Sequence, residues 1–462
     1  MTELTLRRLE PAVPVLAAAL LGLAVVQIAY RTNPIVPLAL AAGAALLVLS
    51  VTRPMVTLYV AVALAPLELL SFQLGGAGLS PTEGMLALSG LGWGASRVVR
   101  GQSPLVSSPL GWPLGLLVLA LVPGIAVAPE PFGVVKVFAL WSCFFLVFQM
   151  VVVDGRRETV TTLLFVLAVS AAVVGALAVI GSGGTTPSLL GAGDKASGRA
   201  SGSFGHPNTL ATFEALALPG ALALGLKGPV AMRPIALASF GMIFAGLALS
   251  LSRGGLLAVA GALLMMLAWG PFRRTVLVAG AVVVIFASAG ASPLGETQQA
   301  QVLGQRLESI TYSAGGVDPR FRVWEVTPQI VSDHPLIGIG ENAFPEVAQR
   351  YGLLLENSAS TYEHAHNIPL TIAAELGLIG LLVLLWLAVA LVQVFVRSYR
   401  NSSTDSGLAL ALAAAFVALT LQGMVDYTLR SATIVGVVFA LAGCAVVLAR
   451  DDKDAHGPAV TP

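Results

Sequence analysis

Hydrophobic residues in this chain are grouped into long runs, and polar residues gather in the short segments between them. A helix needs about 20 apolar residues to cross the hydrocarbon core of a bilayer. Runs of about that length lie at 12–30, 34–51, 54–71, 84–99, 109–127, 132–153, 158–181, 207–226, 231–251, 255–270, 275–292, 367–396, 408–425 and 432–449. The pattern predicts an all-α, polytopic membrane protein with about fourteen transmembrane helices, the runs at 84–99 and 255–270 being the weakest.

The composition agrees with a lipid environment. Of the 462 residues, 56% are hydrophobic and 11% are charged, and the mean hydropathy is +0.87. A water-soluble protein could not bury so much apolar surface in one core. The net charge of +1 gives no basic surface for nucleic acid. The two cysteines, Cys143 and Cys444, lie inside apolar runs, so we expect no disulfide framework and no redox chemistry.

The basic residues predict the orientation. Cytoplasmic loops carry an excess of lysine and arginine. With the N-terminus inside, the cytoplasmic loops hold Arg7, Arg8, Arg53, Arg97, Arg100, Arg156, Arg157, Lys227, Arg233, Arg273, Arg274, Arg397 and Arg400. The opposite short loops hold Arg31, Arg253 and Arg430. We therefore predict a multi-pass membrane protein with both termini in the cytoplasm. Because no A-x-A-like cleavage site precedes Arg31, the first run is expected to be a retained helix.

Two outward loops are longer than a connection requires, at 181–207 and 293–367. In the second, Asp318 and Pro319 predict the start of a short interfacial helix, with Phe321, Trp324 and Val331 at near-helical spacing. Pro328 is expected to kink this helix. The His334-Pro335 step is expected to end it, and Gly338 and Gly340 predict a turn beyond.

Four of the five histidines fall on the outward side: His206, His334, His364 and His366. His364 and His366 belong to the segment Glu363-His364-Ala365-His366-Asn367, directly before the twelfth run. One histidine there can accept a proton from an attacking hydroxyl while a neighbour fixes its tautomer. The alternative is that these polar residues only solvate a helix start, which is common. Metal binding is a weaker third reading, since no further cysteine or compact carboxylate set completes a site.

Several cations and polar groups complete the list of candidates. Arg253 lies in a tight outward turn with glycines beside it, where it either snorkels or clamps a diphosphate. Arg320 and Arg322 in the interfacial helix could neutralise a leaving pyrophosphate, or remain solvated loop residues. Further candidates are Lys136 near the outer end of its run, Asn208 and His206 as helix caps, and the intramembrane carboxylates Glu214 and Glu375.

The stretch from Gly202 to Leu385 resembles the bacterial superfamily of O-antigen ligases and O-antigen polymerases, which are membrane glycosyltransferases. Four segments carry the resemblance: Gly202-Ser203-Phe204-Gly205-His206-Pro207-Asn208; Ser252-Arg253-Gly254; Arg320 to Trp324 followed by His334-Pro335-Leu336-Ile337-Gly338-Ile339-Gly340-Glu341-Asn342-Ala343-Phe344; and His366-Asn367 followed by Glu375-Leu376-Gly377-Leu378-Ile379-Gly380. Each motif alone is weak, whereas their order and placement between runs are fairly specific.

The resemblance implies a GT-C-like fold and transfer of a glycan from an undecaprenyl-diphosphate carrier to an acceptor hydroxyl on a glycan, lipid or protein. Transfer would proceed with inversion and without a metal or other cofactor. By position, Arg253 and Arg320 would bind the diphosphate and His366 would activate the acceptor. Substrate binding would also involve Arg322, His364, Asn367, Asn208, Lys136 and Glu375. Because the sequence places a second histidine before the usual pair, the choice between His364 and His366 is open.

These expectations divide the chain into three parts. Residues 1–181 would form a lipid groove, residues 182–396 the catalytic region with the long loop 293–367, and residues 397–462 the last helices and a cytoplasmic tail. Ligases and polymerases share the motifs, so the sequence does not separate them. A flippase or transporter of lipid-linked sugars is the rival class, although it predicts inverted repeats meeting near the midplane and none is visible. A non-catalytic assembly partner is a third possibility.

Overall fold

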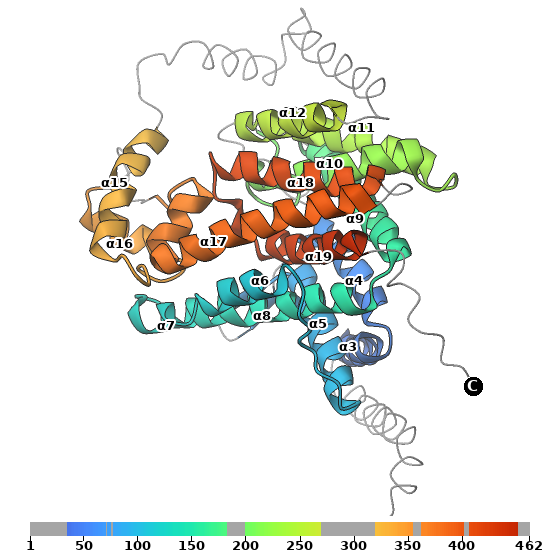
Figure 1. Cartoon of the computed structure of the whole chain (residues 1–462), viewed down its shortest axis with the longest axis horizontal. Coiled ribbons are helices and arrows are strands. Elements are labelled where there is room, and N and C mark those ends of the chain that lie inside the picture. Colours follow the sequence, from blue (N-terminus) through green and yellow to red (C-terminus); the bar gives the residue numbers. More distant parts are fainter. Residues whose placement is uncertain are drawn as a thin grey trace, which may run out of the picture.

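The computed structural model describes residues 35–70, 72–74, 77–182, 199–268, 319–353, 362–401 and 406–450. The first helices are α3 (Ile35–Thr52), α4 (Pro54–Ala63), α5 (Pro81–Val99), α6 (Gly111–Leu119), α7 (Gly124–Val127), α8 (Pro131–Asp154) and α9 (Arg157–Ser182). They are followed by α10 (Pro207–Lys227), α11 (Arg233–Leu249), α12 (Arg253–Ala268), α15 (Pro319–Asp333), α16 (Phe344–Arg350), α17 (Ile368–Asn401), α18 (Ser406–Gly423) and α19 (Ala432–Ala449). Most of them pack side by side in one bundle (Figure 1).

Each predicted apolar run that the structure describes contains a helix, although the run at 54–71 is α-helical only as far as Ala63. Among the described residues, six helices are long and apolar enough to cross a membrane, namely α8, α9, α10, α17, α18 and α19. Shorter apolar helices include α4, α11 and α12. The weak run at 84–99 forms α5, which belongs to neither group, and the runs at 12–30 and 275–292 lie outside the described residues. The chain is a polytopic membrane protein, and the count of about fourteen crossings stays a prediction.

Two local features differ from the predicted pattern. The run at 109–127 divides into α6 and α7 around Pro123, because proline cannot donate a backbone hydrogen bond within a helix. A small antiparallel hairpin, β1 (Phe72–Leu74) and β2 (Ala77–Leu79), follows α4, with Phe72 opposite Leu79. Three residues per strand are too few to give an alternating pattern, so the sequence predicted no strand here.

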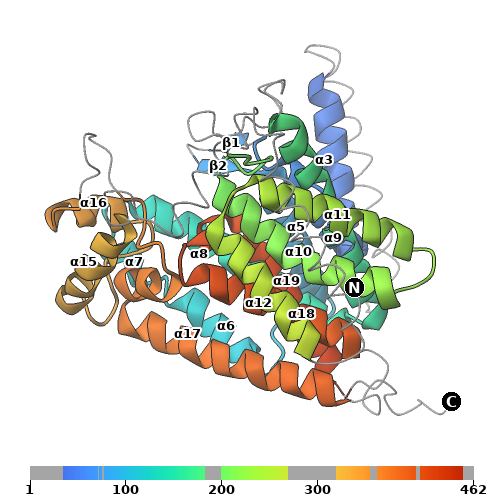
Figure 2. The ribbon, with the colours of Figure 1, turned by 90° about the horizontal axis from the view of Figure 1, so that it is seen from above.

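The helix α10 forms the centre of the bundle, because nearly all of its residues are buried against neighbouring helices. Its Glu214 is fully buried and lies beside Gly175 of α9 and Gly246 of α11. Among the described residues its carboxylate oxygens have no hydrogen-bond partner, so pairing with an internal arginine is not seen. By contrast, α17 runs along the edge of the bundle and leaves most of its surface exposed (Figure 2).

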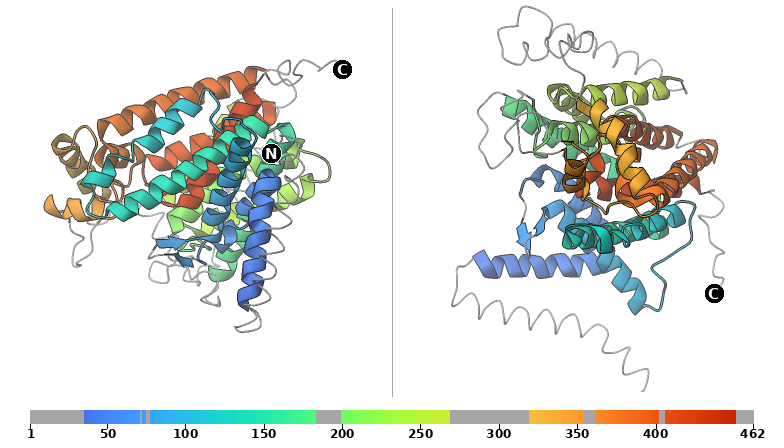
Figure 3. Two further views of the ribbon diagram at one scale, coloured as in Figure 1. Left: turned by 90° about the horizontal axis from the view of Figure 1, so that it is seen from below. Right: turned by 90° about the vertical axis from the view of Figure 1, so that its left-hand side faces the viewer.

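The helices α15 and α16 cover one end of the bundle, beside the start of α17 (Figure 3). As predicted, α15 begins at Pro319 and ends just before His334-Pro335. Its buried face is formed by Val323, Thr327 and Ile330. Phe321 is 57% exposed, which is compatible with an interfacial helix.

The predicted turn at Gly338 and Gly340 is confirmed, and it joins α15 to an interruption in α17. Both glycines have positive φ, as does Gly377 within α17 (φ 68°). The amides of Ile339 and Gly340 donate to the carbonyls of Ala374 and Glu375, each at 2.9 Å. A Cβ at Gly377 would lie 2.2 Å from the carbonyl oxygen of Leu336. The turn is therefore held against α17 by backbone contacts that a side chain at Gly377 would prevent.

Candidate functional site

His366 lies directly before α17, at the end of the segment that the sequence predicts to face outward. Its φ of 50° is left-handed, which is uncommon for a residue with a side chain. The next residue, Asn367, caps the helix by accepting a hydrogen bond from the amide of Leu370 at 2.9 Å. The Asn367 amide nitrogen donates to the carbonyl of Met424, also at 2.9 Å. These contacts fix the start of α17 against the end of α18.

Asp426 supplies a carboxylate partner to His366, which lies beside His364. The Nδ1 of His366 lies 3.1 Å from Oδ1 of Asp426, in the loop after α18. The His366 side chain is 27% exposed, whereas that of Asp426 is 7% exposed. An Nδ1–H donated to a carboxylate directs the lone pair of Nε2 outward and stabilises the imidazolium once a proton is taken. This arrangement is suited to a general base whose ring reaches solvent.

His364 is in a different environment. It is buried, its ring centroid lies 4.3 Å from that of His366, and its Nδ1 accepts the backbone N–H of His366 at 3.2 Å. A neutral ring that accepts at Nδ1 carries its proton on Nε2. His364 therefore supports the backbone turn at His366, while His366 carries the carboxylate partner. The geometry favours His366 as the base.

The ionisation of this cluster follows from its surroundings. Burial and the neighbouring His366 lower the pKa of His364 to about 3, so the ring is neutral at physiological pH. Burial opposes the charge of Asp426, but the hydrogen bond from His366 and the charges of His366, His364 and Arg320 outweigh it and lower the pKa to about 2. A permanent carboxylate thus faces His366, and Arg320 lies within electrostatic reach of it.

The same three residues could also hold a cation. Ligand atoms of His364, His366 and Asp426 lie within 4.8 Å of one another. The sequence interpretation found no carboxylate to complete such a set, and that premise was wrong, because Asp426 is remote in sequence. In the structure, however, Nδ1 of each histidine is already engaged in a hydrogen bond within the protein.

Three helices begin around the loop that carries Asp426. The start of α17 contacts Met424 through Asn367. The start of α10 is tied to the end of α18 by the Gln422 side chain, which donates to the carbonyl of Asn208 at 3.0 Å. At the start of α12, a Cβ on Gly254 would lie 2.7 Å from Val425. Helix N-termini carry partial positive charge and attract anions, while α18 contributes its C-terminal end.

The predicted arginines are distributed unevenly about this loop. Arg253 is the first residue of α12, directly before Gly254 and therefore beside the end of α18. Arg320 lies close enough to Asp426 to affect its pKa. Arg322 instead points to the end of α16, where its guanidinium donates to the carbonyl of Gly352 at 3.1 Å. The structure thus brings Arg253, Arg320 and His366 to one loop, whereas the described hydrogen bond of Arg322 is with the end of α16.

The other candidates make structural contacts. His206 accepts the amide of Asn208 at 3.2 Å, which confirms its predicted capping role. Asn208 binds the guanidinium of Arg199 through Oδ1 at 2.8 Å. Lys136 donates to the carbonyl of Gly78 in the hairpin, and His334 is exposed at the end of α15. No described contact places Lys136 or His334 beside His366.

Glu375 belongs to a buried group of acids behind the histidines. Its carboxyl faces that of Glu341, and the Tyr427 hydroxyl lies 3.4 Å from Glu341 Oε1. Burial raises the pKa of Glu341 to about 7, although the hydrogen bonds with Glu375 and Tyr427 and the charge of Arg430 lower it. Tyr427 in turn stacks edge-on with His364 at 5.5 Å and donates its amide to Asp426 at 2.9 Å. This cluster supports the site from within the protein.

The loop after α18 contributes residues that the sequence interpretation did not assign to the site. Asp426 and Tyr427 were missed, and Arg430 was noted only as an exception to the charge rule. Arg430 forms an ion pair with Glu363, directly before His364. Arg430 itself was the sequence feature that could have pointed to this loop. An arginine in a loop that is predicted to face outward is an exception to the charge rule, and such an exception suggests an anionic partner on that side.

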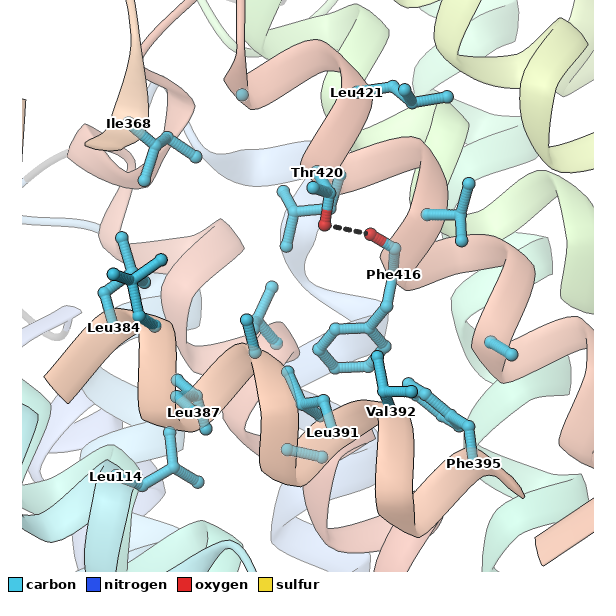
Figure 4. Close-up of a pocket in the computed structure, with 18 of the residues that line it drawn as sticks. Leu114, Ile368, Leu384, Leu387, Leu391, Val392, Phe395, Phe416, Thr420 and Leu421 are labelled. Carbon is cyan, nitrogen blue, oxygen red and sulfur yellow. Dashed lines mark hydrogen bonds between the residues drawn. The ribbon is translucent and has the colours of Figure 1, made fainter. Parts of the chain in front are cut away.

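An apolar groove of about 970 Å³ extends from this site along α17. One end is formed by Ile368, Pro369, Gly423 and Met424, and the other reaches Tyr399 and Arg400. Its walls come from α17, α18 and α19, with Leu114 of α6 and Trp141 of α8 (Figure 4). The close-up shows Leu387, Leu391 and Phe395 of α17 opposite Phe416 and Thr420 of α18. Such a surface suits a long hydrocarbon chain.

Replacing His364 by asparagine is expected to reduce the acid sensitivity of the protein. The folded-state pKa of His364 is lowered, so the unfolded chain, with an ordinary histidine pKa near 6.5, binds the proton more strongly. Stability is therefore lost as the pH falls below about 6.5, by about 2 kcal/mol at pH 5. Thermal unfolding of the detergent-solubilised protein at pH 7.5 and pH 5 measures this loss.

The exposed His334 provides the matched control, and His334→Asn should keep the acid sensitivity of the wild type. An asparagine at position 364 retains an acceptor for the His366 amide. Equal acid sensitivity in His364→Asn and the wild type would contradict a buried neutral ring.

Comparison with protein families gives one match. Residues 238–385 match the family model described as O-antigen ligase. A comparison with curated protein sequences finds no match. The matched segment begins within α11 and ends within α17, so it includes Arg253, Arg320, His364 and His366. It ends before Asp426 and begins after Asn208.

Proposed function

Since the chain carries an O-antigen ligase domain, we propose that it transfers a glycan from a polyprenyl-diphosphate carrier to an acceptor hydroxyl at the extracytoplasmic face of the membrane. The family consists of ligases and polymerases of lipid-linked glycans. The observation that carries the proposal is the His366–Asp426 pair, which lies beside Arg253 and Arg320 at the mouth of an apolar groove.

The reaction assigns a task to each group. His366 Nε2 accepts the proton of the acceptor hydroxyl as its oxygen attacks the anomeric carbon. The bond from that carbon to the diphosphate oxygen breaks, and the diphosphate leaves with the electron pair. Asp426 stabilises the resulting imidazolium. Arg253, Arg320 and the starts of α10, α12 and α17 balance the negative charge of the leaving group, and attack from the opposite side inverts the anomeric configuration.

The groove supports a lipid-linked donor. It begins within two residues of His366 and of Asp426, so a carrier chain lying along α17 would place its diphosphate at the histidine. The groove draws on α17, α18 and α19 as well as on the first helices, whereas the sequence suggested residues 1–181 for this purpose. That division into three parts, the cytoplasmic placement of the termini and the outward position of the site remain part of the proposal.

The test is an assay of the purified full-length protein in nanodiscs with an undecaprenyl-diphosphate glycan and candidate acceptors. We expect a new glycoside and release of undecaprenyl diphosphate, with equal rates in the presence and absence of a chelator. Loss of activity on chelation, restored by one divalent metal, would contradict the metal-free mechanism and assign the three ligands to a cation. A protein that only moved lipid-linked sugars across the bilayer would release no undecaprenyl diphosphate.

Filling the groove is expected to weaken binding of the carrier chain. Ala413 of α18 lines the groove and is buried, so Ala413→Trp should exclude about two methylene groups of a bound chain. At about 0.8 kcal/mol per methylene, KM for the undecaprenyl donor should rise about tenfold. A donor with a two-isoprene chain should show an unchanged KM.

Leu264→Trp is the control for this measurement. Leu264 is 63% exposed on α12 and does not line the groove. If both tryptophan variants changed KM equally, or if the short and long donors responded alike, the carrier chain would lie elsewhere.

A further inference from the structure

Arg199 lies outside the matched segment and is fixed between two elements of the site. Its Nε donates to the carbonyl of Ser250 at 2.9 Å, and its Nη2 donates to Oδ1 of Asn208 at 2.8 Å. Ser250 is three residues before Arg253, and Asn208 is in the first turn of α10. The guanidinium therefore joins the start of α10 to the turn that leads into α12.

The turn held by Arg199 is buried and strained. Ser250, Leu251 and Ser252 are all buried, and Leu251 has a φ of 48°, which is unfavourable for a branched side chain. Ser252 caps α12 by accepting the amide of Gly255 at 3.3 Å. Such strain persists where the surroundings impose it, and the Arg199–Ser250 contact is one such constraint. The orientation of Arg253 thus depends on the same turn that Arg199 holds.

Arg199 is also linked to the loop after α18 through Asn208. The Asn208 side chain accepts a hydrogen bond from the Arg199 guanidinium, and the Asn208 backbone carbonyl accepts one from the Gln422 side chain. Gln422 is four residues before Asp426. His206, two residues before Asn208, feels the charges of Asp426, Arg199, Glu363 and His366 together.

We propose that Arg199 is a third arginine of the diphosphate site, beside Arg253 and Arg320, and that it binds the leaving diphosphate from the α10 side. This inference rests on the proposed function. A planar guanidinium held at two of its nitrogens is preorganised, so it binds a phosphate with little loss of side-chain entropy. Arg199, Arg253 and Arg320 come from three separate elements, and together they would enclose a ligand of two phosphates.

Binding of inorganic pyrophosphate to the purified full-length protein tests this proposal. Arg199→Ala should weaken pyrophosphate binding by about 10- to 100-fold, as expected for the loss of a hydrogen bond to a charged group. Arg199→Lys keeps the charge but loses the fork, so it should weaken binding by less than about tenfold. KM for the donor should rise with the same rank order.

Arg233→Ala is the matched control, because Arg233 also donates from Nε to a backbone carbonyl, that of Gly228, but lies at the start of α11, beyond the opposite end of α10 from Asn208. It should bind pyrophosphate like the wild type. Asn208→Ala releases one contact of Arg199 while keeping its charge, so it should lose less binding than Arg199→Ala. Wild-type pyrophosphate affinity in Arg199→Ala would overturn the proposal, and so would an equal loss in Asn208→Ala and Arg199→Ala.

The result is separable from that of the proposed function. Wild-type protein that transferred glycan normally, together with unchanged pyrophosphate binding in Arg199→Ala, would reject the role of Arg199 alone. Wild-type protein that bound pyrophosphate through Arg199 but formed no glycoside would reject the transferase.

Discussion

Replacing His366 by alanine is expected to lower the rate of glycan transfer by about 10²- to 10⁴-fold, because it removes the group that accepts the proton of the attacking hydroxyl. Binding of the donor should change much less, since the carrier chain and the diphosphate contact other residues. Initial rates at saturating donor, measured together with KM, separate these effects.

Two further variants sharpen this test. Asp426→Asn keeps a hydrogen-bond partner at 3.1 Å from His366 but removes its charge, so a loss of transfer at unchanged donor KM is expected there too. His334→Ala, at an exposed histidine outside the cluster, should retain the wild-type rate. A wild-type rate in His366→Ala would exclude this histidine as the base, and loss of the rate in His364→Asn instead would identify the other one.

The second large effect is expected at Gly377. An alanine there would need a left-handed backbone, and its Cβ would lie 2.2 Å from the Leu336 carbonyl oxygen. The left-handed conformation costs about 1–2 kcal/mol and the overlap adds a similar amount, so Gly377→Ala should destabilise the protein by about 3 kcal/mol. Transfer should fall as well, because the turn holds Glu341 beside Tyr427, next to the histidines. Displacing the turn would move Glu341 away from this position.

A glycine with space around it controls for this substitution. Among the described residues, nothing lies within 4 Å of a Cβ added at Gly241 of α11. Gly241→Ala should be neutral or raise stability by up to about 1 kcal/mol, as alanine does within helices. Thermal unfolding in detergent compares the two variants. Equal midpoints would mean that the turn and α17 are not joined through Gly377.

The helices of this protein were predictable because lipid imposes a simple rule. Each apolar run must satisfy its backbone internally, so a run such as 132–153 can only be a helix, and α8 spans Pro131–Asp154. The same rule says nothing about shorter features. The hairpin at Phe72–Leu79 and the division of α6 from α7 depend on local contacts that hydropathy does not record.

The turn at Gly338 and Gly340 shows a second limit. Two nearby glycines after the His334-Pro335 step predicted a turn, and the positive φ values confirm it. The bonds to Ala374 and Glu375 were not predictable, because backbone pairing between distant segments leaves no pattern in side-chain type. Glu375 could be recognised as an intramembrane carboxylate, but its neighbour is another carboxyl rather than an arginine.

The candidate site was predicted in part for a related reason. His366 was selected from its position before a span, and its partner Asp426 lies 60 residues away in sequence. A lone aspartate in a short loop carries no spacing that links it to a histidine on another helix. Only the packing of α17 against α18 brings the two together.

The residues of the candidate site therefore extend beyond residues 238–385, the segment that matches the family model. A fragment limited to residues 238–385 would contain His366 but would lack Asp426, Asn208 and Arg199. It would also lack α18 and α19, which form much of the groove wall. Replacing that segment by the matching segment of another protein would separate the new histidine from Asp426. The smallest unit worth transplanting extends from about Arg199 to the end of α19.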